Sequence, residues 1–108
     1  MNNHQPKLVR DRIPEIIQAN GQACRWRTLN PSEFQQQVDA KLSEELAEYL
    51  EAGDVEELAD LLEVLYAAAQ ARGCSPMQLD AIRQEKADRR GAFQRRILLE
   101  SVAQTEKR

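Results

Sequence analysis

Residues 41–63, KLSEELAEYLEAGDVEELADLLE, combine apolar residues at helical spacing with a high density of acids. Nine acidic residues and no basic residue lie between Glu44 and Glu63. Gly53 and Asp54 interrupt the run with a residue that commonly ends helices and a residue that commonly caps them. The stretch therefore predicts two consecutive helices joined by a tight turn.

Capping signals place the other elements. Asn30-Pro31-Ser32-Glu33 and Ser75-Pro76-Met77-Gln78 each join an N-cap residue to a proline at the first helical position. The expected helices cover residues 14–20, 31–51, 54–72 and 76–90. Period-two alternation also suggests a small two-stranded β element that could pair residues 24–29 with residues 93–99. The expected fold class is all-α, with three long helices, a short N-terminal helix and this β element.

Length and composition fit one domain over residues 1–108, with a core at about residues 7–99 and frayed ends. Charged residues make up 31% and aromatic residues 5%, which favours charge-faced helices over a β sandwich. The longest apolar run, residues 64–69, is far shorter than the roughly 20 residues of a membrane span. The first six residues show no apolar secretory segment. We therefore expect a soluble, cytoplasmic protein with no membrane partner.

Helical geometry places four acids beside the apolar faces of two helices. At about 100° per residue, Glu45 falls inside the apolar arc of the first long helix and Glu48 at its edge. Glu57 and Asp60 have the same relation to the second. Buried like charges are unfavourable unless they are neutralised, and two divalent cations would balance these four. Oxygen ligands without His or Cys favour Mg²⁺, or Mn²⁺, and phosphate-ester or anhydride chemistry.

These acids also have an ordinary interpretation. Glu57 fits the N3 position of a capping box, where the helix macrodipole favours a negative charge. Asp39 falls inside the first apolar arc as well, and we assign it no role. Glu44 and Glu63 lie beside the four proposed ligands and could support them from a second layer.

Basic residues concentrate near the carboxyl end. Six basic residues against two acids lie between residues 83 and 96. Arginine and lysine bind phosphate oxygens, so this segment predicts substrate contacts; the alternative is a solvated basic face that pairs with the acidic stretch. The candidates are Lys86 and Arg89 first, then Arg83, Arg95, Arg96 and Lys41. Lys7, Arg10 and Arg12 form a second, weaker candidate group for phosphate contacts, and surface charge or packing of the N-terminal segment explains them equally well.

The pairs Glu45-x-x-Glu48 and Glu57-x-x-Asp60 resemble the ExxE…ExxD signature of the all-α nucleoside triphosphate pyrophosphatase (MazG-like) superfamily. Residues 7–14, KLVRDRIP, resemble the opening of its house-cleaning branch, which hydrolyses noncanonical nucleotides. Residues 83–97 resemble that branch's closing segment. The resemblance covers about residues 7–99. It implies a helical core in a homodimer or homotetramer, with Mg²⁺ held by these two acid pairs.

The resemblance implies hydrolysis of a nucleoside triphosphate to a monophosphate and pyrophosphate. Glu48, at the edge of the arc, would orient or deprotonate water, and Glu45 is the other catalytic candidate. Only eight residues separate Glu48 from Glu57, fewer than in many members of the superfamily. This leaves no room there for base-recognising insertions, so the preferred nucleotide stays open.

Two alternatives remain. An enzyme like phosphoribosyl-ATP pyrophosphohydrolase would use the same metal ligands, although the KLVRDRIP opening counts against it. A non-catalytic helical module could instead bind nucleic acid or protein through residues 83–96. A formal net charge of −3 argues against a generic polyanion binder, and hence against a nucleic-acid partner.

Overall fold

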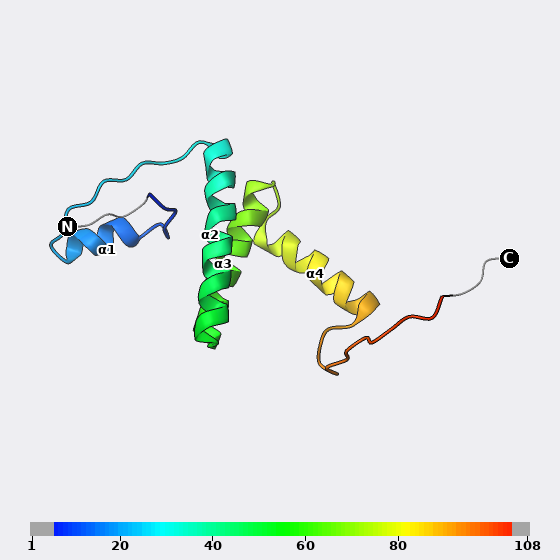
Figure 1. The fold of residues 1–108 in the computed structure, drawn as a ribbon. Coiled ribbons are helices and arrows are strands. Elements are labelled where there is room, and N and C mark those ends of the chain that lie inside the picture. Colours follow the sequence, from blue (N-terminus) through cyan, green and yellow to red (C-terminus); the bar gives the residue numbers. More distant parts are fainter. Residues whose placement is uncertain (1–5, 105–108) are drawn as a thin grey trace.

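The computed structural model describes residues 6–104, and in that range it contains four helices and no strand. The helices are α1 (Ile13–Ala19), α2 (Pro31–Ala52), α3 (Val55–Ala71) and α4 (Pro76–Arg90). This confirms the all-α class. α2 and α3 pack side by side as a hairpin, whereas α4 packs on α3 and then diverges from the pair (Figure 1). None of these four helices has the length and apolar character needed to cross a bilayer.

The turn between α2 and α3 fixes the level at which the two helices face each other. Gly53 adopts a left-handed conformation with φ 72°, which favours glycine, and its N–H donates to the carbonyl of Tyr49 at 2.8 Å. The Asp54 side chain then accepts a hydrogen bond from the N–H of Glu57 at 3.1 Å and caps α3. With only two residues between the helices, the last turns of α2 lie beside the first turns of α3.

The start of α2 is held as its sequence predicts. The Asn30 side chain accepts from the Glu33 N–H at 2.8 Å, and the Glu33 carboxylate accepts from the Asn30 N–H at 3.1 Å. This reciprocal capping box satisfies two backbone donors at the helix end. Ser75 and Gln78 form the same arrangement at the start of α4.

The predicted β element is wrong. Residues 24–29 form an irregular segment that leads into α2, and residues 93–99 follow α4 on the opposite side of the helix pair (Figure 1). The second segment is also bent, because Arg96 has φ 57° and its N–H bonds back to the carbonyl of Phe93. Alternation alone cannot make a strand without a neighbouring strand to pair with.

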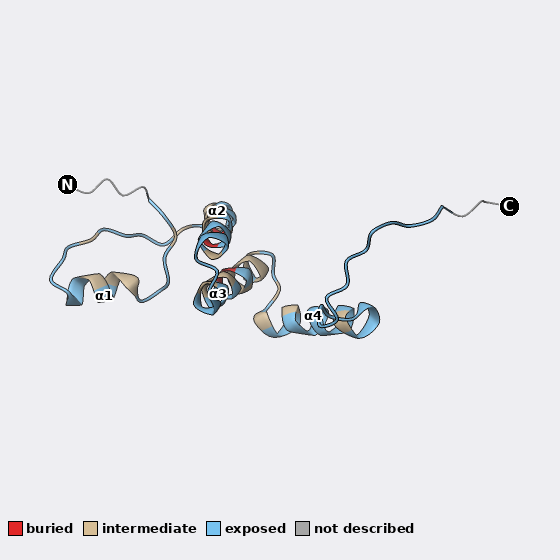
Figure 2. Cartoon of the chain, turned by 60° about the horizontal axis from the view of Figure 1, so that its bottom comes forward, coloured by how far each residue is buried: buried red, intermediate tan, exposed pale blue. Residues whose placement is uncertain are grey.

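The helix pair encloses a very small core. Among the described residues, Val38 (0% exposed) and Val64 (9%) are the buried hydrophobic side chains, and buried positions lie only on α2 and α3 (Figure 2). Other large apolar side chains of the pair stay open, including Leu50 at 71% exposure. The radius of gyration is 19.3 Å, whereas a compact chain of this length has about 13 Å. A single copy therefore leaves most of its apolar surface in water.

Replacement of Val38 tests this core. We expect Val38→Ala to lower the free energy of unfolding by about 1–2 kcal/mol, since it removes two buried methyl groups and leaves a cavity. The matched control is Val55→Ala on α3, where the side chain is 77% exposed and the change should stay within about 0.5 kcal/mol. Chemical denaturation of both variants at one protein concentration makes the comparison. Equal losses would contradict the assignment of Val38 to the core.

Candidate metal centre

Carboxylates from α2 and α3 converge beside the hairpin turn. Oxygen atoms of Glu45, Glu57 and Asp60 lie within 4.8 Å of one another, and oxygen atoms of Glu44, Glu45 and Glu48 form a second such group. We call these five residues the carboxylate cluster. Glu45 belongs to both groups, because it lies on the face of α2 that packs against α3. The four acids that the helical spacing singles out thus lie in two adjoining groups that share Glu45.

Two oxygen atoms of the cluster are buried without a partner. Glu45 is only 7% exposed, and its Oε1 accepts no hydrogen bond. Oε1 of Glu57, on the facing helix, is in the same situation. Buried polar atoms nearly always have a partner, and an unpaired carboxylate oxygen is especially unfavourable. A hard divalent cation bound by oxygens would satisfy both atoms, so the donor set fits Mg²⁺ or Mn²⁺.

The other acids take different positions. Glu48 is exposed at the open edge of the cluster, and Asp60 is half-buried at the opposite edge. Glu44 is half-buried and belongs to the second group of oxygens. Glu63 is exposed and belongs to neither group, so nothing in the geometry brings it to the proposed ligands.

Three cations contact the cluster, and two of them come from the N-terminal segment. Lys41 Nζ lies 3.5 Å from both Glu44 Oε1 and Glu45 Oε2. Lys7 Nζ lies 3.9 Å from Glu44 Oε2, and Arg10 Nη2 donates to Asp60 Oδ1 at 2.7 Å. When all five acids are ionised, these three cations leave a net charge of −2, which one divalent cation would balance.

A count of charges within the acidic stretch alone does not reveal that Lys7 and Arg10 form ion pairs with its acids. Both residues are more than 30 positions away from the acids that they contact. The sequence signal for these contacts is the basic group in the KLVRDRIP segment, but the same group is also consistent with ordinary surface charge. Only the path of the chain beside α2 shows that these residues contact the acids.

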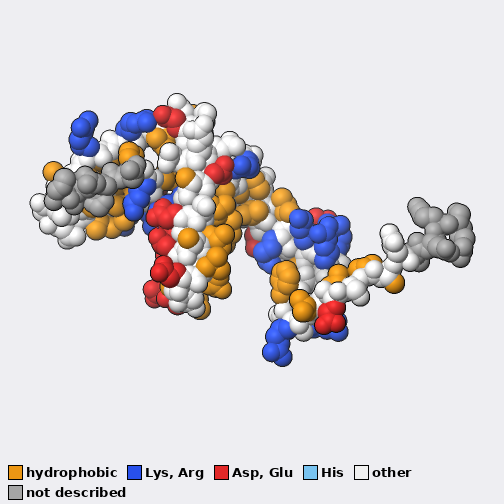
Figure 3. All heavy atoms as spheres, viewed as in Figure 1, with side chains coloured by type: hydrophobic (Ala, Val, Ile, Leu, Met, Phe, Trp, Pro, Cys, Tyr) orange, Lys and Arg blue, Asp and Glu red, His pale blue; other side chains and the backbone are white. Residues whose placement is uncertain are grey.

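The basic residues near the carboxyl end lie apart from the cluster. Arg83 pairs with Asp80 at 2.9 Å on its own helix, and in residues 6–104 no basic residue of 83–96 forms an ion pair with the cluster. All six of these side chains are exposed. α4 packs on α3, and its basic surface is separate from the acidic edge of α2 (Figure 3). One copy of the chain does not bring Lys86 and Arg89 to the proposed ligands.

The cluster shifts the pKa of two of its carboxyl groups. The negative charge of Glu45, followed by burial and Glu44, raises the pKa of Glu48, while Lys41 and Lys7 oppose the rise. Burial raises the pKa of Glu57, and Asp54, Asp60, Glu48 and Glu45 add to it. Lys41 and Lys7 therefore do not fully offset the repulsion and burial that act on Glu48.

Comparison with known proteins leaves the family open. No protein-family model matches the chain, and no solved structure matches it. A protein of Mycolicibacterium smegmatis (strain ATCC 700084 / mc(2)155), described as uncharacterized, is 51% identical over 53 residues. The match covers 49% of this chain and 53% of that protein, so the chain spans about half the length of the curated relative that it matches. Membership of the MazG-like superfamily stays a prediction.

Removal of one cluster charge should stabilise the metal-free protein. A carboxyl group with a raised pKa in the folded state resists ionisation there, so its contribution to stability falls as pH rises from the ordinary value through the raised one. We expect Glu57→Gln to raise the melting temperature at pH 7 in EDTA. The gain should vanish below about pH 4, where the carboxyl group is protonated.

The control for this prediction is Glu56→Gln. Glu56 is exposed in the same first turn of α3, so it shares the favourable macrodipole but not the cluster. Its replacement should leave the melting temperature unchanged or lower it slightly. A lower melting temperature for Glu57→Gln than for Glu56→Gln at pH 7 would contradict the strain that we assign to Glu57.

Proposed function

We propose that the protein is a Mg²⁺-dependent nucleoside triphosphate pyrophosphohydrolase of the MazG-like type, with Mn²⁺ as a substitute cation. The observation that supports it best is the pair of buried, unpartnered oxygens on Glu45 and Glu57, next to Asp60. The nucleotide substrate follows from the resemblance of the two acid pairs and the KLVRDRIP segment to the house-cleaning branch. A cytoplasmic location, where the nucleotide pool is made, is part of the proposal.

The four predicted ligands would hold the cation from two helices. Glu45 and Glu57 would bind it through their unpartnered oxygens, Asp60 from the edge of α3, and Glu48 from the open side. The cation supplies Lewis-acid chemistry, since it activates water and offsets phosphate charge.

Glu48 would accept the proton of the attacking water. It is exposed to solvent and adjoins the buried Glu45 within one group of oxygens. In the proposed reaction, the water oxygen forms a bond to the α-phosphorus and the bond from that phosphorus to the bridging oxygen breaks. Pyrophosphate leaves, and Glu48 accepts the proton of the water. Glu45, buried beside Glu48, would hold the cation and is the other catalytic candidate that the sequence predicts.

The chain's apolar surface supports a homodimer or homotetramer. Hydrophobic side chains gather on one side of the helix pair and acidic side chains on the other (Figure 3). The open leucines on α2 and α3 are Leu46, Leu50, Leu58, Leu62 and Leu65. A second copy on this side would remove them from water and complete the core. Contacts of Lys86 and Arg89 with substrate then require α4 of a neighbouring copy.

The exposed basic surface of α4 supports one competing function. Because these residues lie apart from the acids within one copy, α4 could bind nucleic acid without any catalysis. Oligonucleotide binding that falls steeply with salt and is unaffected by Glu45→Gln would favour that alternative. The other alternative, an enzyme like phosphoribosyl-ATP pyrophosphohydrolase, differs from the proposed function in its substrate, so hydrolysis of phosphoribosyl-ATP in place of nucleoside triphosphates would favour it.

Pyrophosphate release from a panel of ordinary and damaged nucleoside triphosphates tests the function. We expect release that requires Mg²⁺ or Mn²⁺ and stops in EDTA. Glu45→Gln should lower kcat/KM by about 100-fold or more, because it removes a ligand and not merely its support. Glu51→Gln, an exposed acid on the same helix, should leave activity unchanged. Release of orthophosphate in place of pyrophosphate would contradict attack at the α-phosphorus.

The assembly is tested by one charge on the apolar side. Leu62→Glu on α3 should shift the mass measured by light scattering from a dimer or tetramer toward a monomer, because a charge cannot be buried there without a partner. Gln70→Glu adds a charge on the polar side of the same helix and should leave the mass unchanged. A wild-type protein that is monomeric at high concentration would contradict the proposed assembly.

A further inference from the structure

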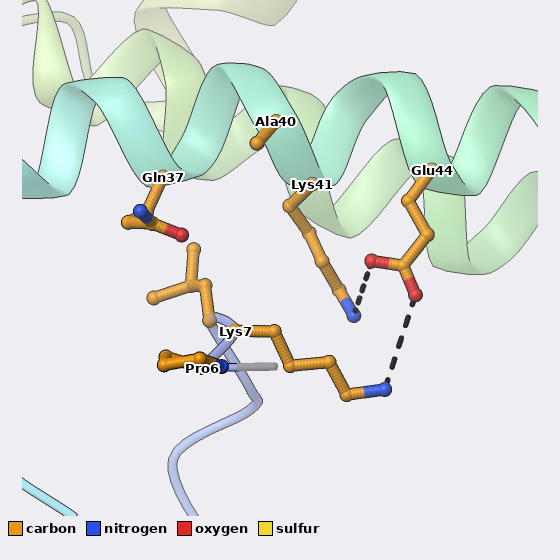
Figure 4. Close-up of a pocket in the computed structure, with 7 residues that line it drawn as sticks. Pro6, Lys7, Gln37, Ala40, Lys41 and Glu44 are labelled. Carbon is orange, nitrogen blue, oxygen red and sulfur yellow. Dashed lines mark ion pairs between the residues drawn. The ribbon is translucent and has the colours of Figure 1, made fainter. Parts of the chain in front are cut away.

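The N-terminal segment lies directly against the carboxylate centre. Residues 6–12, which we call the basic arm, approach α2 (Figure 1), and their Lys7 and Arg10 side chains contact acids of the cluster. Pro6, Lys7 and Leu8 line one wall of a pocket of about 180 Å³, whose other wall is α2. In Figure 4, Lys7 and Lys41 converge on the two oxygens of Glu44 from the arm and the helix. The arm therefore places its charges at the mouth of the proposed metal centre.

The ion pairs of the arm are open to solvent and can be exchanged. The side chains of Arg10 and Asp60 are 56% and 44% exposed, and those of Lys7 and Glu44 are 57% and 36% exposed. Exposed ion pairs contribute little to stability, so these contacts are not required to hold the fold. Asp60 is also one of the predicted cation ligands. A cation bound to Oδ1 of Asp60 would compete with Arg10 for that oxygen and could release its guanidinium.

A bound polyphosphate needs a positively charged group such as the guanidinium of Arg10. It brings more negative charge than one divalent cation balances, and the planar guanidinium of arginine binds two phosphate oxygens at once. Lys7 adds a point charge at the same mouth. The basic residues of α4, by contrast, contact no acid of the cluster within one copy. Among the described residues, the arm thus supplies two exposed cations that already contact the cluster, beside the largely covered Lys41.

Resting on the proposed function, we propose that Arg10 and Lys7 form a phosphate clamp. In the ligand-free protein they pair with Asp60 and Glu44; when a cation with its polyphosphate binds, they turn to the phosphate oxygens. The clamp takes the pyrophosphate portion of the substrate and holds it next to the carboxylate cluster.

Binding of two simple probes tests the clamp. The first probe is Mn²⁺ alone, followed by electron paramagnetic resonance; the second is inorganic pyrophosphate at saturating Mn²⁺, followed by calorimetry. We expect Arg10→Gln to raise the Kd of pyrophosphate by about 10-fold or more, the loss of a charge-assisted hydrogen bond. The Kd of Mn²⁺ should stay the same or fall, because a competitor for Asp60 is gone.

Arg12→Gln is the matched control. Arg12 lies two positions further along the arm, is exposed and pairs with Glu15 at 2.8 Å, away from the cluster. It should change neither Kd. Equal weakening of pyrophosphate binding by Arg10→Gln and Arg12→Gln would overturn the clamp, and so would a loss of Mn²⁺ binding in Arg10→Gln.

The wild-type protein separates the two proposals. If it binds Mn²⁺ but no pyrophosphate, the clamp is wrong and the metal centre stands. If it binds no Mn²⁺, the proposed function fails and the clamp fails with it. Binding of both probes, with only the second sensitive to Arg10, is the result that supports the clamp.

Discussion

Two buried carboxylate oxygens, one on each helix of a packed pair, are the constraint on which the structure depends. Glu45 and Glu57 each leave one oxygen without a partner where α2 packs against α3. Burial of apolar side chains in this small core favours contact between the two helices, whereas repulsion between the two carboxylates opposes it. A fold that keeps such a contact needs positive charge nearby, and Lys41 with the basic arm supplies part of it.

The α2–α3 hairpin has two different surfaces, an acidic edge and an apolar side. Its acidic edge receives the arm and offers oxygen ligands, while its apolar side remains open in a single copy. Burying the open leucines against another copy would stabilise the helix pair and, through it, the spacing of the carboxylates. Under this account, assembly and cation binding support each other because both hold α2 against α3.

Helix ends could be predicted closely from the sequence because their causes are local. Asn30, Asp54 and Ser75 cap the helices that follow them, and the left-handed Gly53 ends α2, as the capping patterns predict. The convergence of the acids follows from helical spacing and a two-residue turn. Other features depend on distant parts of the chain. Residues 24–29 and 93–99 have strand-like alternation but lie on opposite sides of the helix pair, and the contact of Arg10 with Asp60 joins positions 50 apart.

The central claim is that the carboxylate cluster binds a divalent cation. Anomalous diffraction from crystals grown with Mn²⁺ tests it most directly, because the manganese signal locates the ion without reference to activity. The account predicts a peak bonded to oxygens of Glu45, Glu57 and Asp60, with the Arg10–Asp60 ion pair broken. A map at saturating Mn²⁺ with no peak there, and with Arg10 still paired to Asp60, would contradict it.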